Sequence, residues 1–140
     1  MGDTQVNLTR ARLSVDLAIK HVAGKNVGGT VVFIGSVRAS SKGMRVKRME
    51  LEAAEDLAYE DIEHIVKRAH RRFEVLKVYV AHRLGKLQVG EMIVIIAVSA
   101  AHRKDAYGAC RFIIDELKKT TPIWKKELGN GVQRWVGPEA

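Results

Sequence analysis

The sequence has little cysteine, few aromatic residues and no long apolar run. Its 140 residues include a single cysteine, Cys110, which excludes an internal disulfide and a zinc site built from several thiolates. The longest apolar run covers residues 92–98 and is far shorter than the ~20 residues that a membrane-spanning helix needs. The first residues are polar and lack the apolar stretch of a secretory signal, so we expect a reducing, cytoplasmic location.

Several motifs that mark known kinds of site are also missing. The sequence holds no P-loop and no G-x-G-x-x-G run for a nucleotide, and its histidines are not spaced as metal ligands. No Ser-His-Asp arrangement can be read. We therefore expect neither a metal nor a cofactor. Cys110 falls on the apolar stripe of a predicted helix, which indicates a buried structural thiol.

Positive charge is what the sequence has in excess. It contains 24 Lys and Arg against 16 Asp and Glu, a net charge of +8. Such an excess indicates an anionic partner, which could be nucleic acid, a membrane surface, a phosphate ligand or an acidic protein. The hydrophobic share of 46% is ordinary for a folded protein, and the length fits one domain over residues 1–140.

The spacing of apolar residues predicts an α+β fold. Helices are expected at 15–23, 57–73 and 104–119, the last ended by Pro122. Residues 40–43 are expected to form a polar loop, and residues 85–90 a turn region. The middle of the chain is then ordered β-α-β-β-α-β, the order of a split βαβ sandwich, with extra strands at both ends. The expected strands are 6–8, 30–37, 46–52, 77–83, 92–99, 123–128 and 132–136.

Cations stand at the ends of these predicted elements. One follows the strand 30–37, two follow the strand 92–99 at a helix N-terminus, where anions are favoured, and the others flank Pro122. Each taken singly is typical of a solvated charge or a helix C-terminal cation. Taken together they indicate an anion pocket. They are Arg38, His102, Arg103, Lys118, Lys119, Lys125 and Lys126.

Five short segments, in order along the chain, carry a family resemblance. They are FIGSVR at 33–38, HRLG at 82–85 followed by VGE at 89–91, SAAHR at 99–103, LK at 117–118 with PIWKKE at 122–127, and RWV at 134–136. In these segments the chain resembles the catalytic (large) subunit of molybdopterin synthase from about residue 28 to residue 136. One departure is LEAAE at 51–55, which lacks the tyrosine usual in the family at this point.

The resemblance implies a fold, a reaction and an assembly. The implied fold is an α/β hammerhead with an added antiparallel β subdomain. The implied enzyme is a sulfurtransferase that moves two sulfurs to cyclic pyranopterin monophosphate and makes the dithiolene of molybdopterin. Sulfur arrives as a thiocarboxylate on the C-terminal Gly-Gly of a small ubiquitin-like subunit. The large subunits form a homodimer through sheet surfaces, with one small subunit at each end of a heterotetramer.

The resemblance also implies roles for particular residues. Lys118 and Lys125 are implied as the catalytic pair, and Arg38, His102 and Arg103 as the binders of phosphate and pterin. If the chain folds back at Pro122, two close ammonium groups lower at least one lysine pKa. Sulfur is not carried on Cys110. The remaining implied substrate-binding residues are Ser36, Val37, Lys126 and Glu127.

Two other functions stay open at this point. A small basic RNA-binding domain fits the charge, and split βαβ folds often bind RNA. Aromatic residues are only 6% of the chain, however, and Tyr79 alone is expected in mid-strand, so paired base-stacking aromatics are missing. An inactive scaffold of the same fold is disfavoured because Lys118 and Lys125 are both present.

Overall fold

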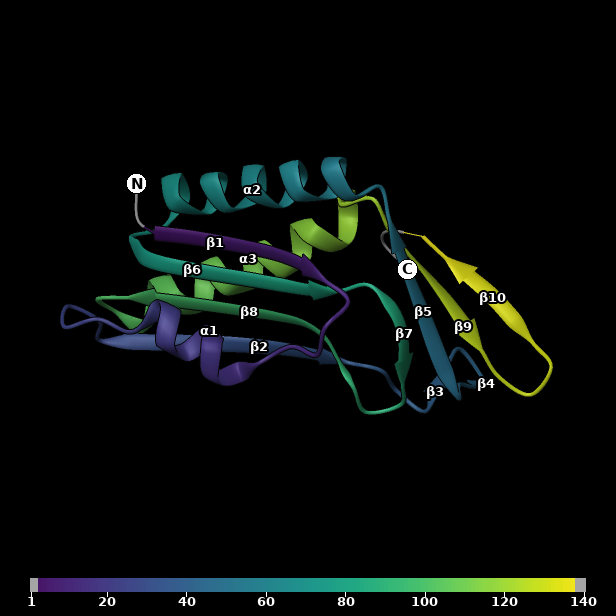
Figure 1. Cartoon of the computed structure of the whole chain (residues 1–140). Helices are drawn as coiled ribbons and strands as arrows, with labels where there is room; N and C mark the ends of the chain where they lie inside the picture. The colour runs from purple at the N-terminus through teal and green to yellow at the C-terminus, as the bar shows by residue number, and fades with distance from the viewer. Residues whose placement is uncertain (1–2, 138–140) are drawn as a thin grey trace.

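The structure, a computed structural model, describes residues 3–137. Figure 1 shows the helices and strands, with several strands between successive helices. The helices are α1 (Val15–Val22), α2 (Glu55–Arg72) and α3 (Arg103–Thr120). The strands are β1 (Asp3–Thr9), β2 (Gly29–Ser36), β3 (Ser40–Ser41), β4 (Met44–Arg45), β5 (Arg48–Ala53), β6 (Val75–Arg83), β7 (Gly85–Gln88), β8 (Met92–Ala100), β9 (Ile123–Leu128) and β10 (Gln133–Val136).

The first sheet has the strand order β1-β6-β8-β2. Strand β1 runs parallel to β6, whereas β8 is antiparallel to both β6 and β2. Helices α2 and α3 lie side by side over one face of this sheet, and the short helix α1 lies on the other face (Figure 1). Within the described residues, β2 is therefore an edge strand with one side free of a neighbour.

The second sheet has the order β10-β9-β5-β7 and is antiparallel throughout. It stands across the end of the first sheet at which β2 and β6 finish (Figure 1). The chain passes from one sheet to the other after the buried Leu84, at Gly85, whose φ of 91° suits glycine. The short strands β3 and β4 pair as a small hairpin beside this sheet.

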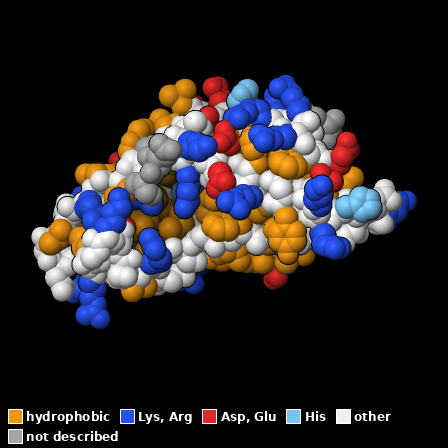
Figure 2. Space-filling model, turned by 180° about the vertical axis from the view of Figure 1, so that it is seen from behind, with side chains coloured by type: hydrophobic (Ala, Val, Ile, Leu, Met, Phe, Trp, Pro, Cys, Tyr) orange, Lys and Arg blue, Asp and Glu red, His pale blue; other side chains and the backbone are white. Residues whose placement is uncertain are grey.

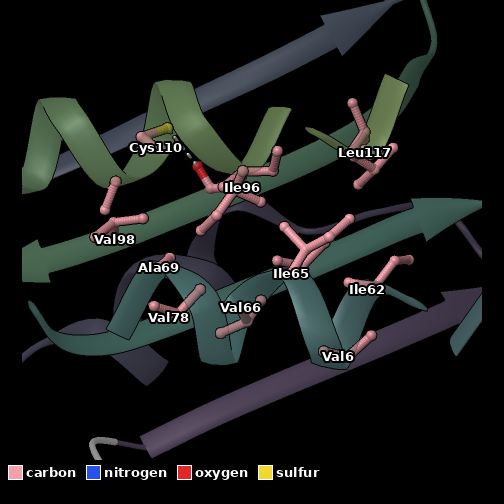
Figure 3. Packing of buried hydrophobic residues seen from close by; sticks show 14 residues of the cluster. Val6, Ile62, Ile65, Val66, Ala69, Val78, Ile96, Val98, Cys110 and Leu117 are labelled. Carbon is pink, nitrogen blue, oxygen red and sulfur yellow. Dashed lines mark hydrogen bonds between the residues drawn. The ribbon is translucent and has the colours of Figure 1, made fainter. Parts of the chain in front are cut away.

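Three clusters of buried apolar side chains hold these layers together. The largest lies between the first sheet and helices α2 and α3 (Figure 3), where Ile62, Ile65, Ile96 and Ile113 are at most 1% exposed. Burying an apolar side chain of this size contributes about 1.5–3 kcal/mol. A second cluster lies under α1. A third joins the two sheets and includes Val37, and it fixes the end of β2 against the second sheet.

The predicted fold class is confirmed, with all three helices and every predicted strand close to its expected place. The last strand of the predicted β-α-β-β-α-β order, β9, pairs with β5 in the second sheet and not with the strands of the first. Two segments expected as loop or turn contain short strands instead, namely β3 and β7. In residues 3–137 no helix is both long and apolar enough to cross a membrane.

Candidate functional site

A cavity of about 350 Å³ lies where the end of β2, the end of α3 and the start of β9 meet. We call it the junction pocket. Its lining includes apolar side chains, among them Phe33, Leu51 and Ile114. Its charged lining is mostly cationic, and Figure 2 shows Lys and Arg side chains around a recess at the end of the molecule that carries the second sheet. The polar lining residues are Ser36, Arg38, Ser41, Lys42, His82, Lys118, Thr121, Lys125 and Glu127.

Arg38 follows the end of β2 and lines the pocket. The pairing of β2 with β8 shifts register between Gly35 and Ser36. Val37 then turns into the core and is 3% exposed, and its backbone N–H donates to the Glu91 carbonyl at 3.0 Å. Ser36 and Arg38, on either side of it, line the pocket. Val37, expected to bind substrate, therefore lies in the core and not among the lining residues.

The end of α3 places the two predicted catalytic lysines on one pocket. Helix α3 stops at Thr120, and the chain reverses through Thr121 and Pro122, where the Ile123 N–H donates to the Thr121 carbonyl at 2.8 Å. The hydroxyl groups of Thr120 and Thr121 both donate to the Asp61 carboxylate on α2. Lys118 before the reversal and Lys125 after it both line the pocket. The prediction that Pro122 lets the chain fold back here is confirmed.

Lys125 lies in surroundings that favour its neutral form. Burial lowers the pKa of Lys125 below its ordinary value, and the charges of Lys118, Arg38 and Lys42 lower it further, while the carboxylate of Glu127 only partly opposes them. The neutral amine is therefore easier to form at Lys125 than at a surface lysine. A neutral amine beside fixed cations can exchange a proton with an anionic substrate that the cations hold.

Glu127 is a buried carboxylate with a dedicated partner. It is 4% exposed, and the Arg134 guanidinium donates to its Oε1 from Nη2 at 2.8 Å and from Nε at 3.2 Å. Burial by itself would raise the pKa of Glu127, but the hydrogen bonds from Arg134 and Ser41 outweigh it and lower the pKa. Glu127 thus stays charged and provides one anion among the pocket cations.

His82 lines the pocket although the sequence analysis gave it no role in the site. It is 5% exposed, and burial, with a smaller effect of Lys125, lowers its pKa to about 4. Its Nδ1 lies 2.8 Å from the Arg83 carbonyl, which can only accept, so Nδ1 carries the proton and Nε2 is free to accept one. In the sequence, the signal for His82 is the HRLG segment at the end of β6.

Three predicted site residues lie away from the pocket. Strands β2 and β8 are antiparallel, so their C-terminal ends lie at opposite edges of the sheet. His102 and Arg103 follow β8 and are exposed at the end of the sheet that lies far from Arg38. Along α3, Arg103 lies about 22 Å from Lys118, at a rise of 1.5 Å per residue. Lys126 extends over the ring of Trp135, with its Nζ 5.6 Å from the ring centre, and is not among the pocket-lining residues.

The single thiol and the mid-strand tyrosine are both buried in the core. Cys110 is 3% exposed, its Sγ donates to the Ile96 carbonyl at 3.7 Å (Figure 3), and burial raises its pKa to about 11. The thiol is therefore protonated at neutral pH, as its predicted structural role requires. Tyr79 is 4% exposed, so its ring is not available for stacking on a base, and the RNA-binding alternative is not supported.

Comparison with known proteins gives a consistent result. The family model described as "MoaE protein" matches residues 8–120. The molybdopterin synthase catalytic subunit of Pyrococcus abyssi is 36% identical over 138 residues, which cover 97% of this chain and 93% of that one. Molybdopterin synthase catalytic subunit 1 of Mycobacterium tuberculosis is 41% identical over 130 residues, covering 93% and 88%. The crystal structure of molybdopterin synthase from Staphylococcus aureus superposes with a TM-score of 0.89 at 31% identity, covering 94% of this chain and 96% of that one.

Proposed function

The chain belongs to the MoaE protein family, and from this membership we propose that it is the catalytic subunit of a molybdopterin synthase. It is a sulfurtransferase that takes sulfur from the C-terminal thiocarboxylate of a small ubiquitin-like subunit. The acceptor is cyclic pyranopterin monophosphate, which receives two sulfurs and becomes molybdopterin. The observation that supports this best is the convergence of Arg38, Lys118 and Lys125 on one pocket.

The pocket has the charge that this reaction needs. The phosphate of the pterin and the thiocarboxylate are both anions, and bringing them together costs free energy unless fixed cations oppose their repulsion. We assign Arg38 to the phosphate, because a guanidinium donates forked hydrogen bonds that fit phosphate oxygens. We assign Lys118 and Lys125 to the sulfur-transfer step. The lowered pKa of Lys125 supports its assignment as the group that moves a proton, with Lys118 holding the anion.

The remaining lining residues fit supporting roles. Ser36 offers a hydroxyl next to Arg38, and Glu127 faces Lys125 from the same strand. The thiocarboxylate arrives on a Gly-Gly tail, which has no side chains and so can pass a narrow channel. We propose that this tail runs along β9, since Ile123, Lys125 and Glu127 of that strand all line the pocket.

The chain works as a homodimer in a heterotetramer, and we propose that the dimer completes the phosphate site. The edge strand β2 is apolar, with Val31, Val32 and Phe33 half-buried and Ile34 41% exposed. A free apolar edge of this kind favours pairing with another strand. A twofold axis perpendicular to β2 reverses its direction and sets the start of one β2 beside the end of the other.

This arrangement would bring the distant cations to the pocket. Arg103 packs against the start of β2, where a Cβ on Gly29 would lie 3.3 Å from the Arg103 Cα. Arg38 follows the end of the same strand. In a twofold dimer, His102 and Arg103 of one protomer therefore approach Arg38 of the other. We also propose a cytoplasmic location, which the free thiol of Cys110 fits, because structural disulfides are rare in reducing compartments.

Reconstitution with purified components tests the function. The chain, a thiocarboxylated small subunit and cyclic pyranopterin monophosphate should yield molybdopterin. Lys118→Ala and Lys125→Ala should each lower turnover ~100-fold or more, the usual effect of losing an acid–base group. Lys119→Ala is the matched control, because Lys119 is adjacent in sequence, exposed, and paired with Glu116 outside the pocket.

The outcomes separate the function from the assignments. If the unaltered chain makes no molybdopterin with an active small subunit, the proposed function is wrong. If it does, but one lysine variant matches Lys119→Ala with saturating partner, that lysine is not catalytic.

A further inference from the structure

The tip of the β3–β4 hairpin has an unusual backbone. Ser41 pairs with Met44, so only Lys42 and Gly43 form the turn, and their φ values are 47° and 80°. Two positive φ angles are what a tight two-residue hairpin turn requires, and glycine meets that requirement without strain. A lysine does so at a cost, since Lys42 is the one residue other than glycine with positive φ in the described part of the chain. The turn thus holds a long cationic side chain where a smaller residue would fit the backbone better.

The hairpin is anchored to the second sheet near its tip and at its base. The Arg134 Nη2 donates to the Ser41 carbonyl at 2.9 Å and to the Ser41 Oγ at 3.2 Å while the same guanidinium holds Glu127. At the base, the Lys47 N–H donates to the Leu128 carbonyl at 2.8 Å. These contacts fix the residue before Lys42 relative to β9 and β10, so the tip has a defined place over the pocket.

Lys42 brings a further positive charge to the junction pocket. It is exposed, yet it is a lining residue of the pocket. Its charge is one of those that act on Lys125. Together with Arg38 it comes from the connection that follows β2, whereas Lys118 and Lys125 come from the α3–β9 side. The pocket cations therefore form two groups on two segments of the chain.

We propose that Lys42 is a substrate-binding residue that contacts the phosphate of the pterin together with Arg38, and that Arg134 is the positioning residue that holds the hairpin for this contact. The inference rests on the proposed function. Phosphate is the favoured anion because Lys42 comes from the same connection after β2 as Arg38, the residue assigned to the phosphate, and lines the same pocket. An ammonium group binds phosphate as a point charge and needs no fixed geometry, which suits a side chain at the rim.

Kinetics with both substrates varied separately test the proposal. Lys42→Met removes the charge and keeps most of the stem, and Lys42→Arg keeps the charge. Lys47→Met is the matched control, because Lys47 is an exposed lysine of the same connection that does not line the pocket. Lys42→Met should raise the KM for cyclic pyranopterin monophosphate ~3- to 10-fold with kcat within about twofold, since a solvated charge contact contributes modestly. Lys42→Arg and Lys47→Met should stay close to the unaltered chain.

Salt dependence and the hairpin anchor give two further readouts. The effect of Lys42→Met should shrink as ionic strength rises to ~1 M, where the Debye length falls to ~3 Å. Arg134→Lys keeps a cation beside Glu127 and should raise the KM for cyclic pyranopterin monophosphate. Adding Lys42→Met to Arg134→Lys should then raise this KM less than it does in the unaltered chain, because the hairpin no longer holds Lys42 at the pocket.

Three results would overturn the proposal. One is an unchanged KM for the pterin in Lys42→Met. Another is a raised KM for the thiocarboxylated partner in place of the pterin, which would assign Lys42 to the tail. The third is an equal effect of Lys47→Met, which would show a general surface potential. In each case the unaltered chain still makes molybdopterin, so the proposed function stands; a chain that makes none refutes that function instead.

Discussion

Mixed dimers offer a direct test of a phosphate site shared between two protomers. Arg38→Ala and Arg103→Ala each remove a charge-assisted contact, which contributes ~1.5–3 kcal/mol. That loss corresponds to a ~10- to 150-fold weaker affinity for the pterin. Either variant as a homodimer carries the damage at both sites, so its turnover at low pterin concentration should fall by at least about tenfold.

A dimer that contains one chain of each variant should behave differently. If the site joins Arg38 of one chain to Arg103 of its partner, one of the two sites carries both substitutions and the other carries none. Mixed dimers isolated through two different affinity tags should therefore recover about half of the unaltered turnover.

The structure also supplies a control that should not recover. Arg38 and Lys118 of one chain line the same pocket, so a mixed dimer of Arg38→Ala with Lys118→Ala has one damaged residue in each pocket. Molybdopterin formation at a pterin concentration below KM is the assay for all the dimers. Equal, low turnover in both mixed dimers would show that Arg103 does not complete the pocket of the partner chain.

Four other predictions concern stability, thiol reactivity and turnover. Arg134→Met should destabilise the fold by about 3 kcal/mol in urea unfolding, because it leaves the buried Glu127 carboxylate without its partner, and adding Glu127→Gln should recover much of that loss. Because the pKa of Glu127 is lower in the folded state, the stability that its charge contributes is present above about pH 4.3 and is lost as pH falls through the folded pKa. A pH-independent difference in unfolding free energy between the unaltered chain and the double variant would contradict this. Cys110 should resist iodoacetamide in the native state and react after unfolding, since it is buried with a pKa of about 11; rapid native alkylation followed by mass spectrometry would contradict this. Thr121→Val should remove one hydrogen bond to Asp61 and lower kcat more than it raises the KM for the pterin, and Thr121→Ser should restore kcat. An unchanged kcat in the valine variant would show that this hydrogen bond does not position Lys118 and Lys125.

The sequence allowed the helices, most strands and three of the pocket cations to be predicted. Lys118 and Lys125 could be placed together because Pro122 stops the helix between them, which is a local effect of proline. Arg38 follows a strand whose apolar run is unmistakable. These features depend on neighbours along the chain, and such features can be read from one sequence.

Features that depend on pairing between distant segments could not be read in the same way. Arg103 and Arg38 both follow buried strands, but only the antiparallel pairing of β2 with β8 shows that these ends lie at opposite edges of the sheet. The local pattern at residues 40–43 predicts a polar loop. The contact that orders this segment comes from Arg134, more than 90 positions later, so it is not visible in that local pattern. The strand β7 was read as a turn because it begins at Gly85 and is followed by Gly90, and its partner β5 lies before α2.

The crossing of the two sheets has a consequence for how the chain matures during synthesis. The strands of the first sheet and its helix α2 are all complete once residue 100 has been made, whereas the buried cluster on that face also needs α3. The pocket needs the end of α3, both lysines around Pro122, and β9 and β10 from the last part of the chain. A chain that ends before β9 therefore lacks the junction pocket. Only a chain translated to its final strands can bind the pterin and receive sulfur.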